Sequence, residues 1–194
     1  NNKDDYKILK SLRSHGWVRD IKTAKKFPNL DPRYIFINSG FNLRPTDIQA
    51  AIGSSQFDKL ETFKKNRISN RKKIIDSLKN DVRWRNQFYF LKVPKDVKPS
   101  YMVFPIFLNP NLKHKKKRFI NTIEKKGLQT RPIISGSFVN QPATKLYSLN
   151  NNREKFKGAN TVEQLGFVIG LHTKKITLKQ IDFIKNNLLF IDRI

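Results

Sequence analysis

The sequence contains no cysteine, which excludes disulfides and metal sites built from thiolates. It also lacks any apolar run near the roughly 20 residues that a membrane-spanning helix needs, and no signal-peptide pattern opens it. We therefore expect a soluble, cytoplasmic protein that has no membrane partner. Acidic residues are scarce as well, since 15 Asp and Glu stand against 40 Lys and Arg in 194 residues, for a formal net charge of +25.

Patterns typical of catalysis are also missing. The chain has no glycine-rich phosphate loop and no nucleophile elbow. Its three histidines, His15, His114 and His172, lie too far apart to form a recognisable metal-binding spacing. We therefore expect no metal site and no catalytic set within this chain. Because it also has no initiator Met, we interpret it as a fragment of a larger protein, in which much of any chemistry lies elsewhere.

The excess of positive charge would suit nucleic acid, because basic surfaces supply most of the non-specific affinity for phosphate backbones. The lysines are dispersed, however, and abundant Asn accompanies them; the only dense run covers residues 113–118. No aromatic-and-basic RNA-binding signature and no zinc-finger spacing is present. We therefore do not expect nucleic acid as the main partner, although a non-catalytic basic binding module stays an alternative.

The pattern of apolar residues predicts an α/β fold. With 38% hydrophobic residues the chain can bury a core, and its length suits one domain or one domain plus an appended segment. Residues 46–79 favour one long helix or two joined helices with a kink at Gly53, whereas residues 18–39 lack periodicity and read as a long loop. Other helices are predicted over 4–14, 116–126, 160–165 and 177–191, and strands over 101–108, 128–134 and 167–171, with Pro105 suggesting an edge or a bulge.

Three of these helix starts carry a capping pattern. A Thr or Asn side chain there can accept a backbone N–H, while Gln or Glu three residues later bonds back to the cap residue. The pairs are Thr46 with Gln49, Asn160 with Glu163, and Thr177 with Gln180.

Three loops concentrate polar groups that core packing does not require: RSHGWVRD (residues 13–20), GFNLRP (40–45) and TRPIISGSFVNQP (130–142). Asn42 and Arg44 come directly before a helix N-terminus, where free N–H groups and partial positive charge favour an anion. Each loop alone is compatible with a turn and surface salt bridges, but three together favour a site for a polar, anionic ligand. The candidate substrate-binding residues are His15, Trp17, Arg19, Arg131, Ser135, Gly136 and Ser137.

The segment GFNLRPTDIQAAIGSSQFDKLETFKKNR resembles a signature of the DegT/DnrJ/StrS family of pyridoxal-phosphate-dependent nucleotide-sugar aminotransferases and dehydratases. In that signature glycine, an aromatic residue, Asn, any residue and Arg or Lys lead into an Asp-Ile-Gln-Ala-Ala helix. The resemblance continues through GLQTRPIISG to the last predicted helix, so it covers essentially the whole chain. It does not cover the family's N-terminal half.

The resemblance implies the C-terminal, small domain of a fold-type I pyridoxal-phosphate-dependent transferase, with helices packed on a small, mainly antiparallel sheet and preceded by a long helix. It assigns residues 1–45 to the end of the large cofactor domain with its active-site loops, 46–80 to the connecting helix, and 81–194 to the small domain. The family's catalytic Lys or His would lie upstream of Asn1. We therefore expect the isolated chain to be inactive.

The resemblance also implies roles for the GFNLRP loop. Asn42 would reach across a homodimer with shared active sites to the phosphate of the neighbouring subunit's cofactor, pyridoxal 5'-phosphate (PLP) or pyridoxamine 5'-phosphate (PMP). Arg44 would reinforce that phosphate site or meet the phosphates of a nucleotide-sugar substrate. The alternative that both residues merely fix the loop before the helix stays open.

Within the family, RSHGWVRD and TRPIISGSFVNQP resemble most the branch of 4-keto-6-deoxysugar 3-dehydratases, which remove the C3 hydroxyl with pyridoxamine phosphate. Members of that branch with an iron–sulfur cluster carry cysteines shortly after the first stretch, where this chain reads IKTA. The resemblance therefore implies the cluster-free type, which acts on GDP-4-keto-6-deoxymannose in deoxysugar and O-antigen (lipopolysaccharide) synthesis and renews its amine from glutamate. A sugar 3- or 4-aminotransferase remains an alternative, because the deciding residue lies upstream.

Overall fold

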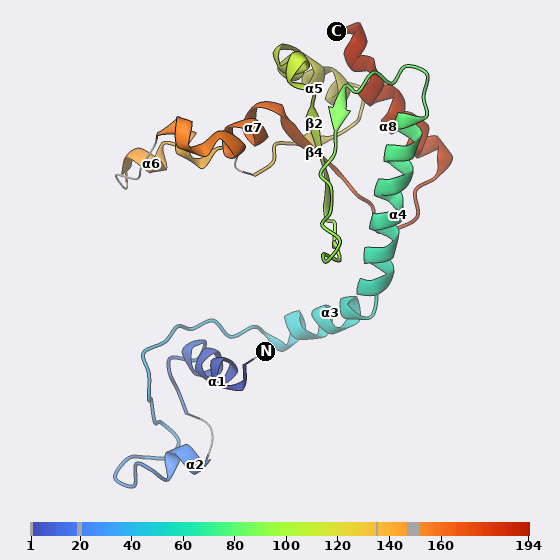
Figure 1. Ribbon diagram of the computed structural model, residues 1–194. Helices are drawn as coiled ribbons and strands as arrows, with labels where there is room; N and C mark the ends of the chain where they lie inside the picture. Colours follow the sequence, from blue (N-terminus) through green and yellow to red (C-terminus); the bar gives the residue numbers. More distant parts are fainter. Residues whose placement is uncertain (1, 19–20, 135, 147–151) are drawn as a thin grey trace. The chain divides into compact units, whose positions relative to one another are not determined.

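The computed structural model describes residues 2–18, 21–134, 136–146 and 152–194 and has two compact units, Asn1–Asp58 and Lys59–Ile194 (Figure 1). The boundary between them lies within the segment 46–80, which the sequence assigned to a connecting helix. Whether the chain divides functionally at residues 45 and 80 stays a prediction.

The first unit contains the helices α1 (Lys3–Leu12), α2 (Ile21–Ala24) and α3 (Asp47–Phe57). α3 begins with the predicted capping box: Thr46 Oγ1 accepts the Gln49 N–H, and the Gln49 carboxamide accepts the Thr46 N–H. Neither α1 nor α3 has a buried residue. Apart from α2, the predicted loop over residues 18–39 contains no regular helix in its described part.

Residues 46–79 form two helices. α3 ends at Phe57, and α4 (Leu60–Lys79) begins after Asp58 and Lys59. The break between the two helices thus falls at Asp58 and Lys59, whereas Gly53, where the sequence suggested a kink, lies inside α3.

The second unit is built on an antiparallel four-stranded sheet with the order β1-β2-β4-β3. The strands are β1 (Phe88–Tyr89), β2 (Val103–Leu108), β3 (Thr130–Arg131) and β4 (Gly166–Gly170). The predicted small, mainly antiparallel sheet is therefore confirmed. β1 was not predicted, and β3 is shorter than expected because Pro132, which has no N–H, follows it.

Pro105 lies in β2 opposite Val168 of β4. β2 is an inner strand, but the described pairing of β1 reaches only Phe107 and Leu108. The proline therefore lies on a stretch of β2 that is open on the β1 side, where it leaves no β1 hydrogen bond unmade.

Helices complete the second unit around the sheet (Figure 1). The core cluster joins α4, α5, α8 and the strands, with Ile74, Phe104, Phe119 and Leu188 each at most 1% exposed. Burial of such apolar side chains is the main stabilising contribution in a fold of this size. Besides α4, the helices are η1 (Pro110–Lys115), α5 (Lys116–Lys125), η2 (Phe138–Asn140), α6 (Ala143–Leu146), η3 (Arg153–Phe156), α7 (Lys157–Leu165), α8 (Leu178–Leu188) and η4 (Leu189–Arg193).

Two helix boundaries differ from the predicted ones. α7 begins at Lys157, directly after η3, so Asn160 lies inside the helix and does not cap it. The predicted helix over 177–191 ends as α8 at Leu188 and continues as the 3-10 turn η4. Its capping box of Thr177 and Gln180 is confirmed.

Polar side chains of α4 hold the segment between β4 and α8. Asn70 is 2% exposed; its Nδ2 donates to the carbonyls of His172 and Lys174, and its Oδ1 accepts the Ile176 N–H. All three hydrogen bonds link residues more than 100 positions apart in the sequence. A buried amide satisfied in this way ties α4 to the segment that leads into α8.

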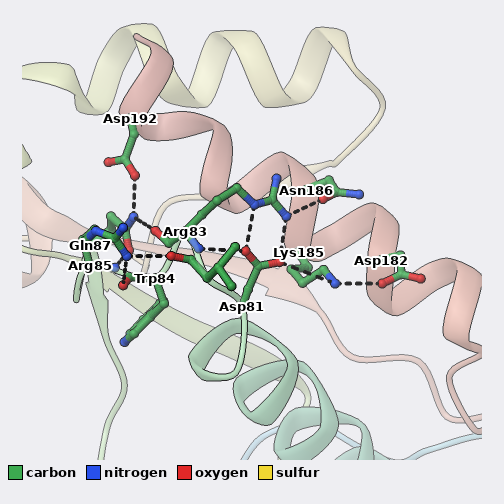
Figure 2. Close-up of polar contacts among 10 residues, drawn as sticks. Asp81, Arg83, Trp84, Arg85, Gln87, Asp182, Lys185, Asn186 and Asp192 are labelled. Atoms are coloured by element: carbon green, nitrogen blue, oxygen red, sulfur yellow. Dashed lines mark hydrogen bonds and ion pairs between the residues drawn. The ribbon is translucent and has the colours of Figure 1, made fainter.

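A second polar network fastens α8 to the turn that follows α4 (Figure 2). The Asp81 carboxylate, whose side chain is 11% exposed, accepts from the Arg83 guanidinium at 2.8 Å and lies 3.6 Å from Lys185 Nζ. Arg83 Nη2 also donates to Asn186 Oδ1 at 2.7 Å. The hydrogen bonds from Arg83 and the charge of Lys185 hold the pKa of Asp81 well below its usual range.

Among the described residues, no helix combines the length and the apolar composition that crossing a membrane would require.

Candidate functional site

The first two candidate loops pair with each other in the first unit. Backbone hydrogen bonds connect residues 12–18 with residues 35–43, and bridges pair Ser14 with Asn42 and Trp17 with Phe36 in antiparallel orientation. In each bond a backbone N–H donates to a backbone carbonyl. The donor and acceptor pairs are Phe41 to Leu12, Leu43 to Arg13, His15 to Phe41, Ile37 to Gly16 and Val18 to Ile35. RSHGW and GFNLRP are therefore one paired structure, which places their side chains close together.

Two glycines permit this pairing. Gly16 has a φ of 80°, and a Cβ there would overlap the carbonyl of Asn38; a Cβ on Gly40 would overlap the carbonyl of Leu12. His15 precedes Gly16 and also has a positive φ, 62°, an uncommon conformation for a residue with a side chain. Backbone approach this close requires glycine, so the glycines in RSHGW and GFN serve the geometry of the site.

Trp17 lies at the centre of an aromatic cluster. Its ring stacks with Tyr34 at 6.0 Å between centroids and with Phe36 at 6.4 Å, and its Nε1 donates to the carbonyl of Arg33 at 2.8 Å. The Arg44 guanidinium lies over the Trp17 ring, 6.0 Å from its centroid. The half-buried Trp17 thus joins the two loops, and its predicted role toward a substrate stays a prediction.

The turn that presents the Arg33 carbonyl to Trp17 is closed by a salt bridge. Arg33 Nη2 lies 2.7 Å from Asp31 Oδ2, and the Arg33 backbone N–H also bonds to that carboxylate. These hydrogen bonds lower the pKa of Asp31 to about 2. Arg33 is thereby paired within its own turn.

Asn42 and Arg44 are both exposed. Within the described part of the chain, the Asn42 carboxamide forms no hydrogen bond to protein, while its backbone neighbour Leu43 is fixed to Arg13. An amide and a guanidinium on a fixed backbone are donors suited to the phosphate of a cofactor such as PLP. These residues therefore fit that group, and their contact with it stays a prediction.

Two further candidate residues of the first loop are His15 and Arg19. His15 is exposed and donates its backbone N–H to Phe41, while Arg19 lies outside the described residues.

The third loop belongs to the second unit. Arg131 is exposed at the end of β3 and donates to the carbonyl of its neighbour Thr130 at 2.8 Å. Gly136 has a φ of 71° and closes a turn by donating to the Ile133 carbonyl, and Ser137 is fully buried. Ser135 lies outside the described residues.

Glu163 and Asn140 contribute to the third loop and were not among the candidate residues. Glu163 Oε2 accepts the Ser137 N–H at 2.8 Å and Asn140 Nδ2 at 2.7 Å. The sequence pattern assigned Glu163 to a cap at Asn160, because the spacing fits a capping box. The true partners lie 23 and 26 residues away, so no local pattern could identify them.

No group of three or more His, Asp or Glu side chains that could hold a metal ion occurs in the described ranges. The polar groups gathered in these loops are mainly donors and therefore suit anionic ligands.

A family model of the DegT/DnrJ/EryC1/StrS aminotransferases matches residues 1–188. The chain belongs to this family. The match includes both paired loops, the third loop and the sheet. Membership is established by sequence and does not depend on the side-chain contacts described above.

Individual relatives extend this result. The chain is 24% identical over 195 residues to a GDP-4-keto-6-deoxy-D-mannose 3-dehydratase of Escherichia coli O55:H7. The aligned region covers 95% of this chain and 47% of the relative. A structure of the E. coli GDP-4-keto-6-deoxy-D-mannose-3-dehydratase superposes with a TM-score of 0.75 at 21% identity, over 96% of this chain and 48% of that one. The chain thus spans about half the length of these relatives.

The Helicobacter pylori aminotransferase PseC, involved in the biosynthesis of pseudoaminic acid, has the same fold. It superposes with a TM-score of 0.76 at 19% identity, over 98% of this chain and 47% of that one. At this level of identity the likeness shows the fold and does not separate dehydratase from aminotransferase.

Proposed function

We propose that this chain is the C-terminal portion of a PLP- or PMP-dependent enzyme that modifies a nucleotide sugar, and that the enzyme is a GDP-4-keto-6-deoxymannose 3-dehydratase. The observation that carries the proposal is the pairing of the RSHGW and GFNLRP loops in a chain of this family. That pairing brings an exposed amide, Asn42, and an exposed guanidinium, Arg44, onto one fixed backbone. The proposal includes a cytoplasmic location and a place in deoxysugar synthesis for lipopolysaccharide.

The ligands follow from the same relatives. Solved dehydratases of this type hold hydrated PLP, GDP-perosamine or a PLP-glutamate geminal diamine. We infer the same ligand classes here: the cofactor, a GDP-sugar and glutamate as amino donor. When bound, the cofactor supplies the electron sink that lets a sugar hydroxyl leave.

The residues of this chain would bind and orient these ligands and perform no proton transfer of their own. Asn42 donates its amide N–H to the cofactor phosphate, and Arg44 adds a charge-assisted bond to that phosphate or to the diphosphate of the nucleotide. Trp17 and His15 flank this pair. In the second unit, Arg131 and Gly136 are the proposed contacts to the sugar nucleotide, and the fully buried Ser137 supports the turn behind them. The catalytic Lys or His is supplied by the preceding half of the enzyme.

The experiment is an assay of the protein encoded by the complete reading frame that contains this chain. With PLP, glutamate and GDP-4-keto-6-deoxymannose, we expect a product that has lost its 3-oxygen, detected by mass spectrometry. The isolated 194-residue chain should give none. A product in which the keto oxygen is replaced by an amine would instead establish the sugar aminotransferase, the alternative that the fold shared with PseC equally permits.

The proposal also includes a homodimer in which Asn42 serves the partner's cofactor. Two-fold symmetry then lets each subunit complete the other's site. Mixing a variant without the upstream catalytic residue with the double variant Asn42→Ala, Arg44→Ala should restore up to one working site per heterodimer. Heterodimers no more active than the sum of the parents would place both residues in their own subunit's site or outside any site.

A basic module without catalysis is the remaining candidate. It would bind no PLP in the complete protein, so the absence of a cofactor absorption band together with affinity for nucleic acid would favour it over the enzyme.

A further inference from the structure

One carboxylate holds both ends of the turn in the third loop. The 3-10 turn η2 begins after Ser137 and ends at Asn140, and Glu163 Oε2 accepts from the backbone N–H of Ser137 and from the side chain of Asn140. A single oxygen atom thus sets the distance between the first and last residues of the turn.

Gly136 makes this contact possible. Its φ is 71°, and a Cβ at this position would lie 3.0 Å from Glu163 Cγ and 3.1 Å from its Cβ. The Glu163 side chain therefore occupies the space beside the glycine, and the backbone of the turn lies directly against it. From the sequence, Gly136 is expected to let the backbone approach a ligand closely. In the structure, the Glu163 side chain packs directly against it.

Glu163 is itself attached to a well-anchored element. It lies on α7, which runs directly into the inner strand β4 through the buried Leu165. Its backbone carbonyl accepts from Lys116 Nζ of α5 at 2.6 Å. Burial lowers the pKa of Lys116, and the charge of Glu163 opposes that shift. The Glu163 carboxylate thus links the turn to a helix that is anchored in the core.

We propose that Glu163 is a positioning residue that holds the Gly136–Asn140 turn in the shape that receives the nucleotide sugar. This role rests on the proposed function, because it takes the turn to be part of the substrate site. Glu163 acts through Ser137 and Asn140 and makes no contact with substrate of its own. The geometry of its acceptor oxygen carries the effect, and its negative charge does not.

The test compares three variants of the complete enzyme. Glu163→Ala removes the acceptor, Glu163→Gln retains one carbonyl oxygen in the same place, and Gln164→Ala is the control. Gln164 is an exposed neighbour on α7 for which no side-chain hydrogen bond is seen among the described residues. For each variant kcat and KM for the GDP-sugar, the PLP absorption band and the exchange rate of the Ser137 amide hydrogen are measured.

We expect Glu163→Ala to raise KM about ten- to a hundredfold, since misplacing a substrate-contacting group by about 1 Å costs up to 10²-fold. The PLP band and kcat should change little, because binding contacts of this kind act on ground and transition states alike. Glu163→Gln should return KM and the Ser137 exchange rate close to wild type, and Gln164→Ala should match wild type.

The outcomes separate the two proposals. A folded Glu163→Ala enzyme with unchanged KM, or equal damage in the Ala and Gln variants, overturns the positioning role and leaves the proposed function intact. A wild-type enzyme that binds no nucleotide sugar overturns the proposed function and this role with it. If Glu163→Ala does not fold, Asn140→Ala removes one of the two donors without altering α7, and an unchanged KM there overturns the role.

Discussion

The two units of the chain are stabilised in different ways. In the first, Val18 and Ile35 are the buried apolar residues of the described part, and the structure rests on backbone pairing between residues 12–18 and 35–43. In the second, a continuous core joins α4, α5, α8 and the sheet. Large apolar side chains of the first unit, such as Leu9, remain exposed. The candidate cofactor residues therefore lie where local backbone geometry matters most, and the free energy of unfolding is supplied mainly by the other unit.

The chain contains a fluorescent reporter for each unit. Its two tryptophans are Trp17 in the first and Trp84 in the second. Single-tryptophan variants, Trp84→Phe and Trp17→Phe, can therefore follow the unfolding of the two units separately.

The largest expected effect is loss of a core side chain from the second unit. Phe104→Ala should lower the free energy of unfolding by about 3–5 kcal/mol, because it removes a fully buried ring and leaves a cavity. Phe57→Ala, at a position 73% exposed in the first unit, should change it by less than about 0.5 kcal/mol. Urea unfolding followed at Trp84 measures both, and similar losses would show that stability is shared evenly.

The next comparison is between one salt bridge of each unit, Asp81 with Arg83 in the second and Asp31 with Arg33 in the first. Asp81→Asn should cost about 1.5–3 kcal/mol, the usual contribution of a hydrogen bond to a charged group. Asp31→Asn should change the unfolding midpoint very little, because the side chains of Asp31 and Arg33 are 44% and 79% exposed.

The cost of Asp81→Asn should depend on pH. Since the folded-state pKa of Asp81 is lowered, its stabilisation is fully present above the ordinary pKa of 3.8 and is lost as the pH falls through the folded-state pKa. The difference between wild type and Asp81→Asn should therefore shrink below about pH 4. Urea midpoints at neutral and acidic pH measure it, and a difference that grows on acidification contradicts the assignment.

Glycine substitutions should act in opposite directions in the two units. Gly16→Ala should destabilise the loop pairing by at least about 1–2 kcal/mol, because a side chain disfavours the left-handed conformation and would also overlap Asn38. Gly158→Ala should stabilise α7 by up to about 1 kcal/mol, since a Cβ there meets nothing within 4 Å. Trp17 fluorescence reports the first change and Trp84 the second; a tolerated Gly16→Ala would argue against the paired loops.

The smallest effect compares two capping boxes of the same Thr-x-x-Gln type. Thr177→Ala should cost about 1 kcal/mol, the usual contribution of an N-cap, because α8 packs into the core. Thr46→Ala removes the corresponding bond from the Gln49 N–H at the start of α3, which buries no side chain, and should leave the Trp84 unfolding midpoint unchanged. Equal shifts in that midpoint would mean that α3 unfolds together with the core.

Prediction from the sequence succeeded where the signal is local. The capping boxes at Thr46 and Thr177 and the strand around Phe104 follow from neighbouring residues, and the structure confirms them. It failed where a local pattern competed with a distant partner. Glu163 fits a cap three residues after Asn160, yet its carboxylate bonds to Ser137 and Asn140 instead.

The same distinction between local and distant signals applies to the candidate site. The sequence indicated the residues of RSHGW and GFNLRP and the family to which they belong, because glycines, an amide and cations before a helix form a recognisable order. It could not indicate that the two loops pair, since the bridges of Ser14 with Asn42 and of Trp17 with Phe36 rest on backbone hydrogen bonds, which nearly every residue type can make.

The sequence by itself determined the kind of chain: a cysteine-free, basic α/β chain of the DegT family, with capped helices and polar loops whose chemistry suits a phosphate. Only the tertiary structure decided which loops meet, which carboxylate holds the third loop, and which segment Asn70 of α4 binds between β4 and α8. The reason is physical. Helix periodicity and capping are encoded within a few residues, whereas backbone pairing and buried amide bonds depend on which distant segments the packed core brings together.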